Sequence, residues 1–207
     1  MPWPTSPGRG QTGRVELMWT VMPAPGPIGA LTVGTTAEGL ALVVFGDHPE
    51  AAAQAAERLG VAAVTGLPHP DVQAVGAQPA EDRTAGLTAA LAQLREYLAG
   101  ERRVFDLPLD WSLTRGSQRR VLSTLYTSVG YGETVTYGEL AARSDLGSAY
   151  TAARGVGAIM GSNPLPVVVP CHRVMAADGL GGFGGGRATK EWLLAHEGVL
   201  TAALDFG

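Results

Sequence analysis

Cysteine is almost absent from this chain, since Cys171 is the only one among 207 residues. A single cysteine cannot form an intramolecular disulfide, which excludes the disulfide-stapled scaffolds of small secreted proteins. We therefore expect a protein of a reducing compartment, the cytoplasm.

Charged residues are also scarce, at 16% of the chain against about a quarter in an average domain. Apolar residues reach 45%, so the composition predicts a folded protein with a real core and excludes an intrinsically disordered body. No run approaches the roughly 18 apolar residues of a transmembrane helix. The first 14 residues hold three prolines and no apolar segment, so we expect neither a signal peptide nor a membrane partner.

The net charge of −4 argues against a polybasic surface over the whole molecule. The charges are unevenly distributed. Residues 1–110 carry seven basic and twelve acidic side chains, whereas residues 111–207 carry eight basic and seven acidic ones. A polyanion such as DNA would therefore bind to the second half.

Two domains are predicted, an α/β N-terminal domain over 18–108 and a mainly α C-terminal domain over 111–207, preceded by a flexible tail over 1–17. The tail is rich in Pro, Gly and Ser and lacks periodicity. The expected elements of the first domain are a β-hairpin over Gly29–Val33 and Gly39–Phe45, helices over 49–59 and 84–99, and a long loop over 65–84.

In the second domain, the spacing predicts helices over 117–128, from Thr136 to about residue 144, and over 148–160. Thr136 and Glu139 have the spacing of a capping box. A helix, a four-residue turn and a further helix form the outline of a helix-turn-helix. We expect the last helix to bury Ala152, Ala153, Val156, Ile159 and Met160.

The exposed face of that last helix carries mostly small residues at helical spacing: Tyr150, Thr151, Arg154, Gly155, Ala158 and Gly161. A nearly bare face with one guanidinium can approach a nucleic-acid groove closely. The alternative is that the small residues pack against another helix and that Arg154 is merely solvated.

Around the cysteine, the apolar run after Asn163 predicts a buried strand that ends at Pro170. Cys171 would then lie at a rigid corner, where free N–H groups favour a thiolate. His172 is a possible base, but side chains adjacent in sequence meet awkwardly, so a bridging water is expected. The alternative is that Cys171 is a small buried hydrophobe.

The run Pro170-Cys171-His172-Arg173-Val174 resembles the active-site signature of the O6-alkylguanine-DNA alkyltransferases. The resemblance covers residues 115–200 and continues through the segments 137–141, 152–157, 163–164 and 190–198. The first domain is similar only in its hairpin, its second helix and its linker.

This resemblance implies DNA repair by irreversible transfer of an alkyl group from guanine O6 to Cys171, without any cofactor. His172 would act through water as the base, with Glu197 orienting it, and Asn163 would hold the turn. Tyr137 would interact with the base and the backbone of the flipped nucleotide. The DNA-binding residues would be Arg154, which fills the gap in the duplex, with Tyr150, Thr151, Gly155 and Ala158.

The resemblance also implies a substrate pocket lined by Met160, Pro166, Val174, Phe183 and Gly184. Where the family usually has a Tyr in this loop, this chain has Phe183, so we expect an altered pocket edge rather than lost activity. Ser117 and Leu122 stand where the family usually has Phe and Trp. Some relatives hold zinc through Cys and His in the first domain, which the single Cys171 excludes here.

Residues 179–184 formally satisfy the dinucleotide pattern G-x-G-x-x-G, yet no convincing strand precedes them and fewer than 30 residues follow. A mobile lid over the Cys171 pocket is the better interpretation. His48, His69 and His196 lack the spacing of metal ligands, so no metal is expected.

The sequence thus predicts a single-turnover alkyltransferase that acts on double-stranded DNA and is monomeric in solution. Two alternatives stay open. One is a sensor that binds alkylated DNA without repairing it, for which the cysteine would be unnecessary. The other is a cysteine hydrolase that uses Cys171 and His172 and gains nothing from DNA.

Overall fold

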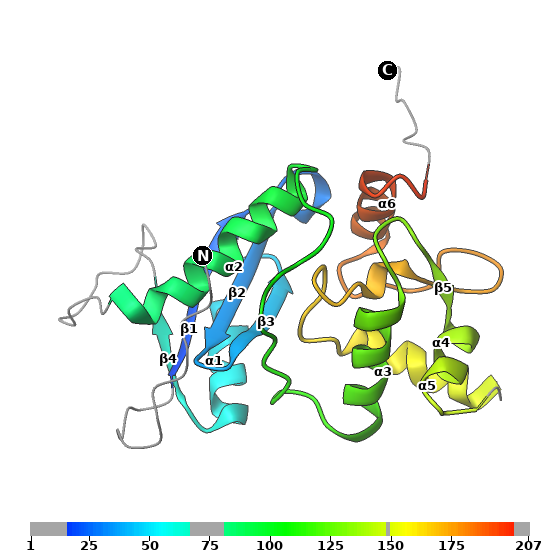
Figure 1. The fold of residues 1–207 in the computed structure, drawn as a ribbon, viewed down its shortest axis with the longest axis horizontal. Coiled ribbons are helices and arrows are strands. Elements are labelled where there is room, and N and C mark those ends of the chain that lie inside the picture. Colours follow the sequence, from blue (N-terminus) through cyan, green and yellow to red (C-terminus); the bar gives the residue numbers. More distant parts are fainter. Residues whose placement is uncertain (1–15, 67–80, 148–149, 201–207) are drawn as a thin grey trace. The chain divides into compact units, whose positions relative to one another are not determined.

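A computed structural model describes residues 16–66, 81–147 and 150–200 (Figure 1). The chain divides into two compact units, one ending at Leu113 and the other beginning at Thr114. The first unit contains a sheet and the second is mainly helical, which confirms the predicted fold class. None of the helices in the described ranges is long and apolar enough to span a membrane.

The first unit is built on a four-stranded sheet in the order β3-β2-β1-β4. Strands β1 (Glu16–Pro23), β2 (Ala30–Thr36) and β3 (Gly39–Phe45) are antiparallel neighbours, and β4 (Ala62–Thr65) is parallel to β1. Helices α1 (Pro49–Leu59) and α2 (Glu81–Leu98) pack on the sheet, and a short 3-10 turn, η1 (Gly26–Ile28), joins β1 to β2. The predicted hairpin and the first predicted helix are confirmed.

Successive side chains of a strand point to opposite faces of the sheet, and in this sheet both faces carry apolar side chains. Leu17 and Leu42 share one face with the alanines of α1, namely Ala52, Ala55 and Ala56. Tyr97 and the leucines of α2 are buried as well.

Two expectations for the first unit were wrong at their boundaries. Strand β1 includes Glu16 and Leu17, which we expected in the flexible tail, and Leu17 is fully buried. The loop expected over 65–84 is shorter, because β4 extends to Thr65 and α2 already begins at Glu81. Residues 67–80 and His69 lie outside the described residues.

The second unit contains helices α3 (Gly116–Ser128), α4 (Tyr137–Arg143), α5 (Tyr150–Gly161) and α6 (Arg187–His196). Helices α3, α4 and α5 pack against one another. The capping box is confirmed, since Thr136 accepts from the Glu139 backbone N–H and the Glu139 carboxylate accepts from the Thr136 N–H. Helices α4 and α5 retain the outline of the helix-turn-helix, with residues 148–149 outside the description.

A short parallel ladder in this unit joins β5 (Val135–Thr136) to β6 (Val174–Met175). It holds the start of α4 beside the segment that follows Cys171. Three side chains expected to be buried on α5, Ala152, Ala153 and Ile159, are only half-buried, whereas Val156 is completely enclosed and Met160 is buried.

The segment after α5 does not form the predicted strand. Residues 165–169 are buried, but they turn instead of extending, and Val167 adopts a left-handed φ of 74°. The Val169 N–H donates to the Leu165 carbonyl at 2.7 Å. Proline has no N–H to donate to a ladder, and Pro164, Pro166 and Pro170 interrupt the apolar run at both ends and within it.

Candidate active site

Cys171 begins a 3-10 turn, η2 (Cys171–Arg173), that follows directly on the buried turn. The side chain of Asn163 fixes this turn by accepting from the Leu165 N–H at 3.0 Å and donating to the Val169 carbonyl at 2.8 Å. The cysteine itself is only 4% exposed. The sulfur is therefore held by a rigid loop and shielded from solvent.

The environment of Cys171 keeps it protonated in the free protein. Burial raises the pKa of the Cys171 thiol to about 11, because a thiolate is costly away from water. A hydrogen bond from Asn163 and the positive charge of Lys190 act in the opposite direction and favour the thiolate. The thiol becomes reactive only if a base takes its proton.

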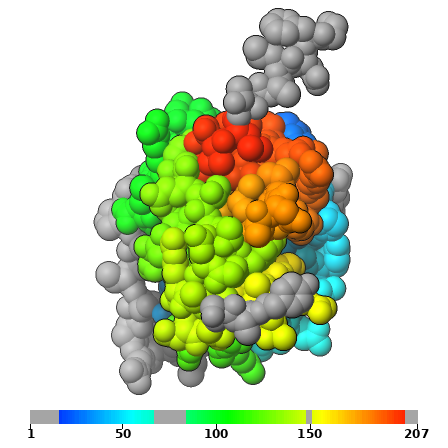
Figure 2. Space-filling view, turned by 90° about the vertical axis from the view of Figure 1, so that its right-hand side faces the viewer, coloured from blue at the N-terminus to red at the C-terminus, as the bar shows by residue number. Residues whose placement is uncertain are grey.

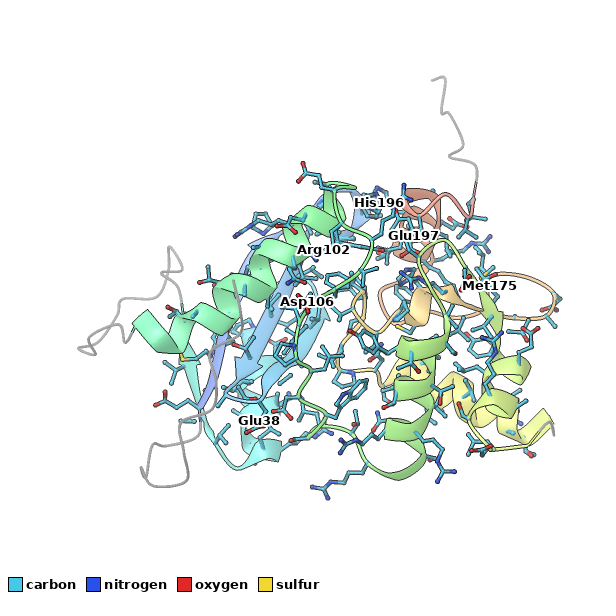
Figure 3. The ribbon with its side chains drawn as sticks, in the orientation of Figure 1. Glu38, Arg102, Asp106, Met175, His196 and Glu197 are labelled. Carbon is cyan, nitrogen blue, oxygen red and sulfur yellow. The ribbon has the colours of Figure 1, made fainter. Side chains whose placement is uncertain are left out.

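His172 lies in a fully buried polar cluster with Arg173 and Glu197. The Nε2 atom of His172 is 2.8 Å from Oε1 of Glu197. Arg173 donates to both oxygens of the same carboxylate at 2.8 Å and to the Val129 carbonyl. Figure 3 labels Glu197 just beyond the end of α6. One carboxylate thus orients both the imidazole and the guanidinium of the turn that carries the nucleophile.

The protonation states in this cluster follow from burial and hydrogen bonding. Burial alone would raise the pKa of Glu197, but hydrogen bonds from His172 and Arg173 and their charges hold it well below its ordinary value. Burial lowers the pKa of His172, although Glu197 opposes this shift. A neutral His172 that donates from Nε2 to Glu197 leaves Nδ1 as a bare acceptor, and Nδ1 has no hydrogen-bond partner within the described residues.

Lys190 is a further buried charge in this unit, and sequence reasoning assigned it no role. Its side chain is completely enclosed, and Nζ donates to the carbonyls of Val174, at 2.6 Å, and of Leu180. Burial lowers the pKa of Lys190 to about 8, and a thiolate at Cys171 would raise it. Its position could have been found from spacing, because it shares the buried face of α6 with Leu193 and Leu194.

Tyr137 begins α4, and its hydroxyl donates to the Gly182 carbonyl at 3.3 Å. Burial raises the pKa of Tyr137, and the negative charge of an ionised Cys171 raises it further. The Tyr137 phenol therefore keeps its proton at neutral pH and can donate a hydrogen bond.

A cavity of about 540 Å³ opens beside Tyr137. Three elements form it, namely the start of α4, helix α5 and the loop after β6, and Figure 2 shows α5 and this loop on one face. Its lining consists of Tyr137, Ala153, Arg154, Gly157, Met160, Gly161, Gly182, Phe183 and Gly184.

Three of the five expected pocket residues, Met160, Phe183 and Gly184, line this cavity. The other two do not. Pro166 is buried in the turn before Cys171, and Val174 is buried in β6, where it pairs with Val135.

The outer face of α5 is open, as predicted. The residues Thr151, Arg154, Gly155, Ala158 and Gly161 are all exposed, and the side chain of Tyr150 lies outside the described residues. A Cβ atom added at Gly155 or Gly161 would meet nothing within 4 Å. Among the side chains that the structure describes on this face, none beside Arg154 is bulky.

Across the described part of the chain, no three His, Cys, Asp or Glu side chains gather as a metal site would require. His48 pairs with exposed Glu50, and the ring of His196 stacks on Trp192 at 4.9 Å. Each of these two histidines thus interacts with a nearby side chain of its own helix region and not with a cluster of metal ligands.

Comparison with known proteins covers both units. Residues 18–111 match the ribonuclease-like domain of 6-O-methylguanine DNA methyltransferase, and residues 116–199 match its DNA-binding domain. The human methylated-DNA–protein-cysteine methyltransferase is 36% identical over 178 residues, which is 83% of this chain and 77% of the human protein. The chain belongs to the 6-O-methylguanine DNA methyltransferase family.

Other members of this family are similar to the chain over different shares of its length. The mouse protein is 54% identical over 40% of this chain, and the Mycolicibacterium paratuberculosis protein is 50% identical over 52%. The matched regions span 39% and 63% of the lengths of those two relatives. Mycobacterium tuberculosis OGT in complex with DNA superimposes with a TM-score of 0.62 at 31% identity, covering 91% of this chain and 96% of that one.

In the second unit, the structure shows some of the contacts expected among the predicted catalytic residues. His172 and Glu197 are in direct contact, and Asn163 braces the turn of Cys171. Arg173 was quoted only as part of the motif, yet it is the residue that binds Glu197 most fully.

Proposed function

We propose that this chain repairs O6-alkylguanine in duplex DNA by moving the alkyl group to Cys171, and that each molecule reacts once. One observation carries the proposal: a buried thiol shares a turn with a histidine whose second ring nitrogen has no partner among the described residues. The same unit of this family member holds a cavity lined by Tyr137 and Arg154. The relatives named as methylated-DNA–protein-cysteine methyltransferases support the reaction class.

The first step proposed is deprotonation of the thiol. His172 is neutral, and Glu197 holds its ring through Nε2, so Nδ1 is the atom that can accept the proton through a bridging water. The imidazolium that forms is stabilised by the Glu197 carboxylate. The charge of Lys190 and the amide of Asn163 stabilise the thiolate.

In the second step, Sγ attacks the alkyl carbon in line with the bond to O6. The S–C bond forms as the C–O6 bond breaks, and the electron pair leaves on the guanine. Tyr137 donates a hydrogen bond to the developing anion, which stabilises charge that exists only during transfer. The guanine finally takes up the proton that the thiol released. The thioether is stable, so Cys171 is consumed.

Access to the alkyl carbon requires the nucleotide to leave the duplex. Base flipping costs a few kcal/mol in unstacking and unpairing. The small-residue face of α5 lets this helix-turn-helix approach the minor groove, and Arg154 at the cavity would enter the gap in the stack. We propose that the protein acts as a monomer in the cytoplasm, a setting that suits its single reduced cysteine.

Substitution of Arg154 with alanine tests the flipping step. We expect transfer from methylated duplex DNA to slow by about 10- to 100-fold, which corresponds to roughly 1.4–2.7 kcal/mol of lost stabilisation. Transfer from free O6-benzylguanine should change by less than about threefold, because a free base needs no flipping. Single-turnover rates on both substrates provide the measurement, and equal losses on the two would refute this role of Arg154.

The reaction itself is tested by intact mass. After incubation with excess duplex carrying O6-methylguanine, the protein should gain one methyl group on the Cys171 peptide and stop at one equivalent. Continued turnover would indicate a hydrolase. Binding to the methylated duplex without any adduct would indicate a sensor, and either result overturns the proposal.

A further inference from the structure

The turn between α3 and β5, residues 129–134, lies against the residues that end α6, where Figure 3 labels His196 and Glu197. The Tyr131 hydroxyl donates to the His196 carbonyl at 3.0 Å. The Gly132 N–H donates to Oε2 of Glu197 at 3.3 Å. This turn therefore contacts both the backbone and the carboxylate of the segment that orients His172.

The same turn also holds Arg173. The Val129 carbonyl accepts from Nη1 of Arg173 at 2.8 Å, and the guanidinium carbon lies 6.0 Å from the centroid of the Tyr131 ring. A cation at this distance over an aromatic face is attracted by the ring. Arg173 is thus held by the turn on one side and by Glu197 on the other.

The two oxygens of Glu197 are divided between these partners. Oε1 contacts the ring of His172 and Nη2 of Arg173, whereas Oε2 accepts from Nε of Arg173 and from the Gly132 N–H. The terminal torsion of a carboxylate is soft, so hydrogen bonds on both oxygens are needed to fix its plane. The bonds to Oε2 therefore keep Oε1 directed at the imidazole.

Gly132 makes this close approach possible. Its φ is 76°, and a Cβ atom there would come within 3.2 Å of the Glu197 backbone carbonyl. The turn also has bonds of its own, since the Gly130 N–H donates to the Glu133 carboxylate at 2.9 Å and the Gly130 carbonyl accepts from the Glu133 N–H at 3.2 Å. These bonds shape the turn independently of Glu197, so it can act as a rigid support.

We propose that Tyr131 and Gly132 are positioning residues for the proton transfer: they hold Glu197 so that its Oε1 fixes the His172 ring with Nδ1 as the proton acceptor. Both act through Glu197, whose bond to Nε2 decides which ring nitrogen carries the proton. The expected effect on the transfer rate rests on the proposed function. The expected effect on the imidazole does not, because it requires no substrate.

The test examines the imidazole of His172 in wild type and in two variants of the turn. Tyr131→Phe removes the hydroxyl but keeps the ring beside Arg173. Gly132→Ala places a Cβ against the Glu197 carbonyl. Nitrogen NMR of protein with isotope-labelled histidine, recorded at neutral pH, distinguishes a protonated Nε2 from a protonated Nδ1.

Each variant has a matched control. Gly198→Ala makes the same change directly after Glu197, at a φ of 78°, but the added Cβ would meet no described atom within 4 Å. Tyr97→Phe removes a hydroxyl from a fully buried tyrosine of the first unit, whose ring packs on Phe105. The controls thus reproduce the backbone strain and the lost hydroxyl without displacing the Glu197 carboxylate.

We expect His172 to carry its proton on Nε2 in wild type and in both controls, and to show a mixture of the two tautomers in both turn variants. Transfer from methylated duplex should slow by about 3- to 10-fold in Tyr131→Phe, the effect of losing one hydrogen bond of ordinary strength. Gly132→Ala should slow it by about 10- to 100-fold, as is usual when the partner that orients a functional group is displaced. Both controls should stay within about twofold of wild type.

A His172 ring that keeps its proton on Nε2 in both turn variants would overturn the inference, even if transfer slowed, because the turn would then act only through the fold. A changed tautomer with an unchanged rate would overturn it as well. If Gly132→Ala failed to fold, Tyr131→Phe and its control would decide. A wild-type protein that formed no adduct would refute the proposed function, while the NMR comparison would still decide whether the turn holds His172 through Glu197.

Discussion

Replacement of Cys171 with alanine is expected to abolish alkyl transfer completely while changing the affinity for duplex DNA by less than about threefold. The sulfur is the only atom proposed to form a bond with the alkyl carbon, so nothing can replace it at this site. Cys171 is buried, whereas the proposed DNA contacts lie on the exposed face of α5. Alanine is smaller than cysteine and fits the same turn, which Asn163 continues to brace through the Val169 carbonyl.

Intact mass after exposure to methylated duplex measures transfer, and fluorescence anisotropy with the same duplex measures binding. Arg154→Ala is the matched comparison, since it should weaken the use of duplex DNA while keeping the thiol. Persistence of a methyl adduct in Cys171→Ala would place the acceptor elsewhere. Loss of DNA binding together with transfer would show that the cysteine supports the fold of the DNA-binding face.

Substitution of Glu197 with glutamine is expected to lower the free energy of unfolding at pH 7 by about 3–5 kcal/mol, because it leaves a buried guanidinium without its counterion. Arg173 donates to both carboxylate oxygens, and His172 shares one of them. Transfer should slow as well, since His172 would lose the charge that stabilises its protonated form. Urea denaturation followed by tryptophan fluorescence gives the first quantity, and single-turnover transfer from a free base gives the second.

Glu191→Gln is the matched control for this variant. Glu191 forms an ion pair with Arg187 on the same helix, but that guanidinium side chain is 79% exposed. Solvent-exposed pairs contribute at most about 1 kcal/mol, so we expect a much smaller change than at Glu197. Equal effects of the two substitutions would show that the buried cluster does not stabilise the fold.

The pH dependence of stability has a defined direction. The pKa of Glu197 is lowered on folding, so its contribution is complete above the unfolded value of 4.5 and is lost as the pH falls toward the folded value. The pKa of His172 is also lowered, and below about 6.5 the unfolded chain gains a proton that the folded chain does not. Wild-type stability should thus fall from about pH 6.5 downward. The gap between wild type and Glu197→Gln should be smaller at pH 3.5 than at pH 7.

Features that depend on neighbours in sequence were predictable. The capping box at Thr136 and Glu139, the helix expected over 117–128 and the exposed small residues of α5 follow from spacing alone, because each is decided within a few turns of helix. The roles of Cys171 and its neighbours came from the resemblance of the motif, and the structure adds the contact between His172 and Glu197.

Features that depend on distant residues were not predictable from the chain alone. An apolar run such as 165–169 has the composition of a buried strand, and only the tertiary bonds of Asn163 identify it as a turn. Arg173 looks like an ordinary surface cation until the fold encloses it, whereas the spacing of Lys190 with Leu193 and Leu194 could have indicated its burial. Pro166 and Val174 were assigned to the pocket from the resemblance, but both are buried and neither lines the cavity.

The short ladder between β5 and β6 has a consequence for how firmly the proposed site is assembled. It pairs Val135 with Val174 and Thr136 with Met175, and it places Tyr137 and Cys171 on either side of so small a patch of backbone. Such a ladder can open locally while the surrounding helices stay intact, since opening free energies differ from one part of a protein to another. Separating Tyr137 from Cys171 would therefore require less free energy than unfolding the whole domain. We expect alkyl transfer to be lost at a lower denaturant concentration than the fold itself.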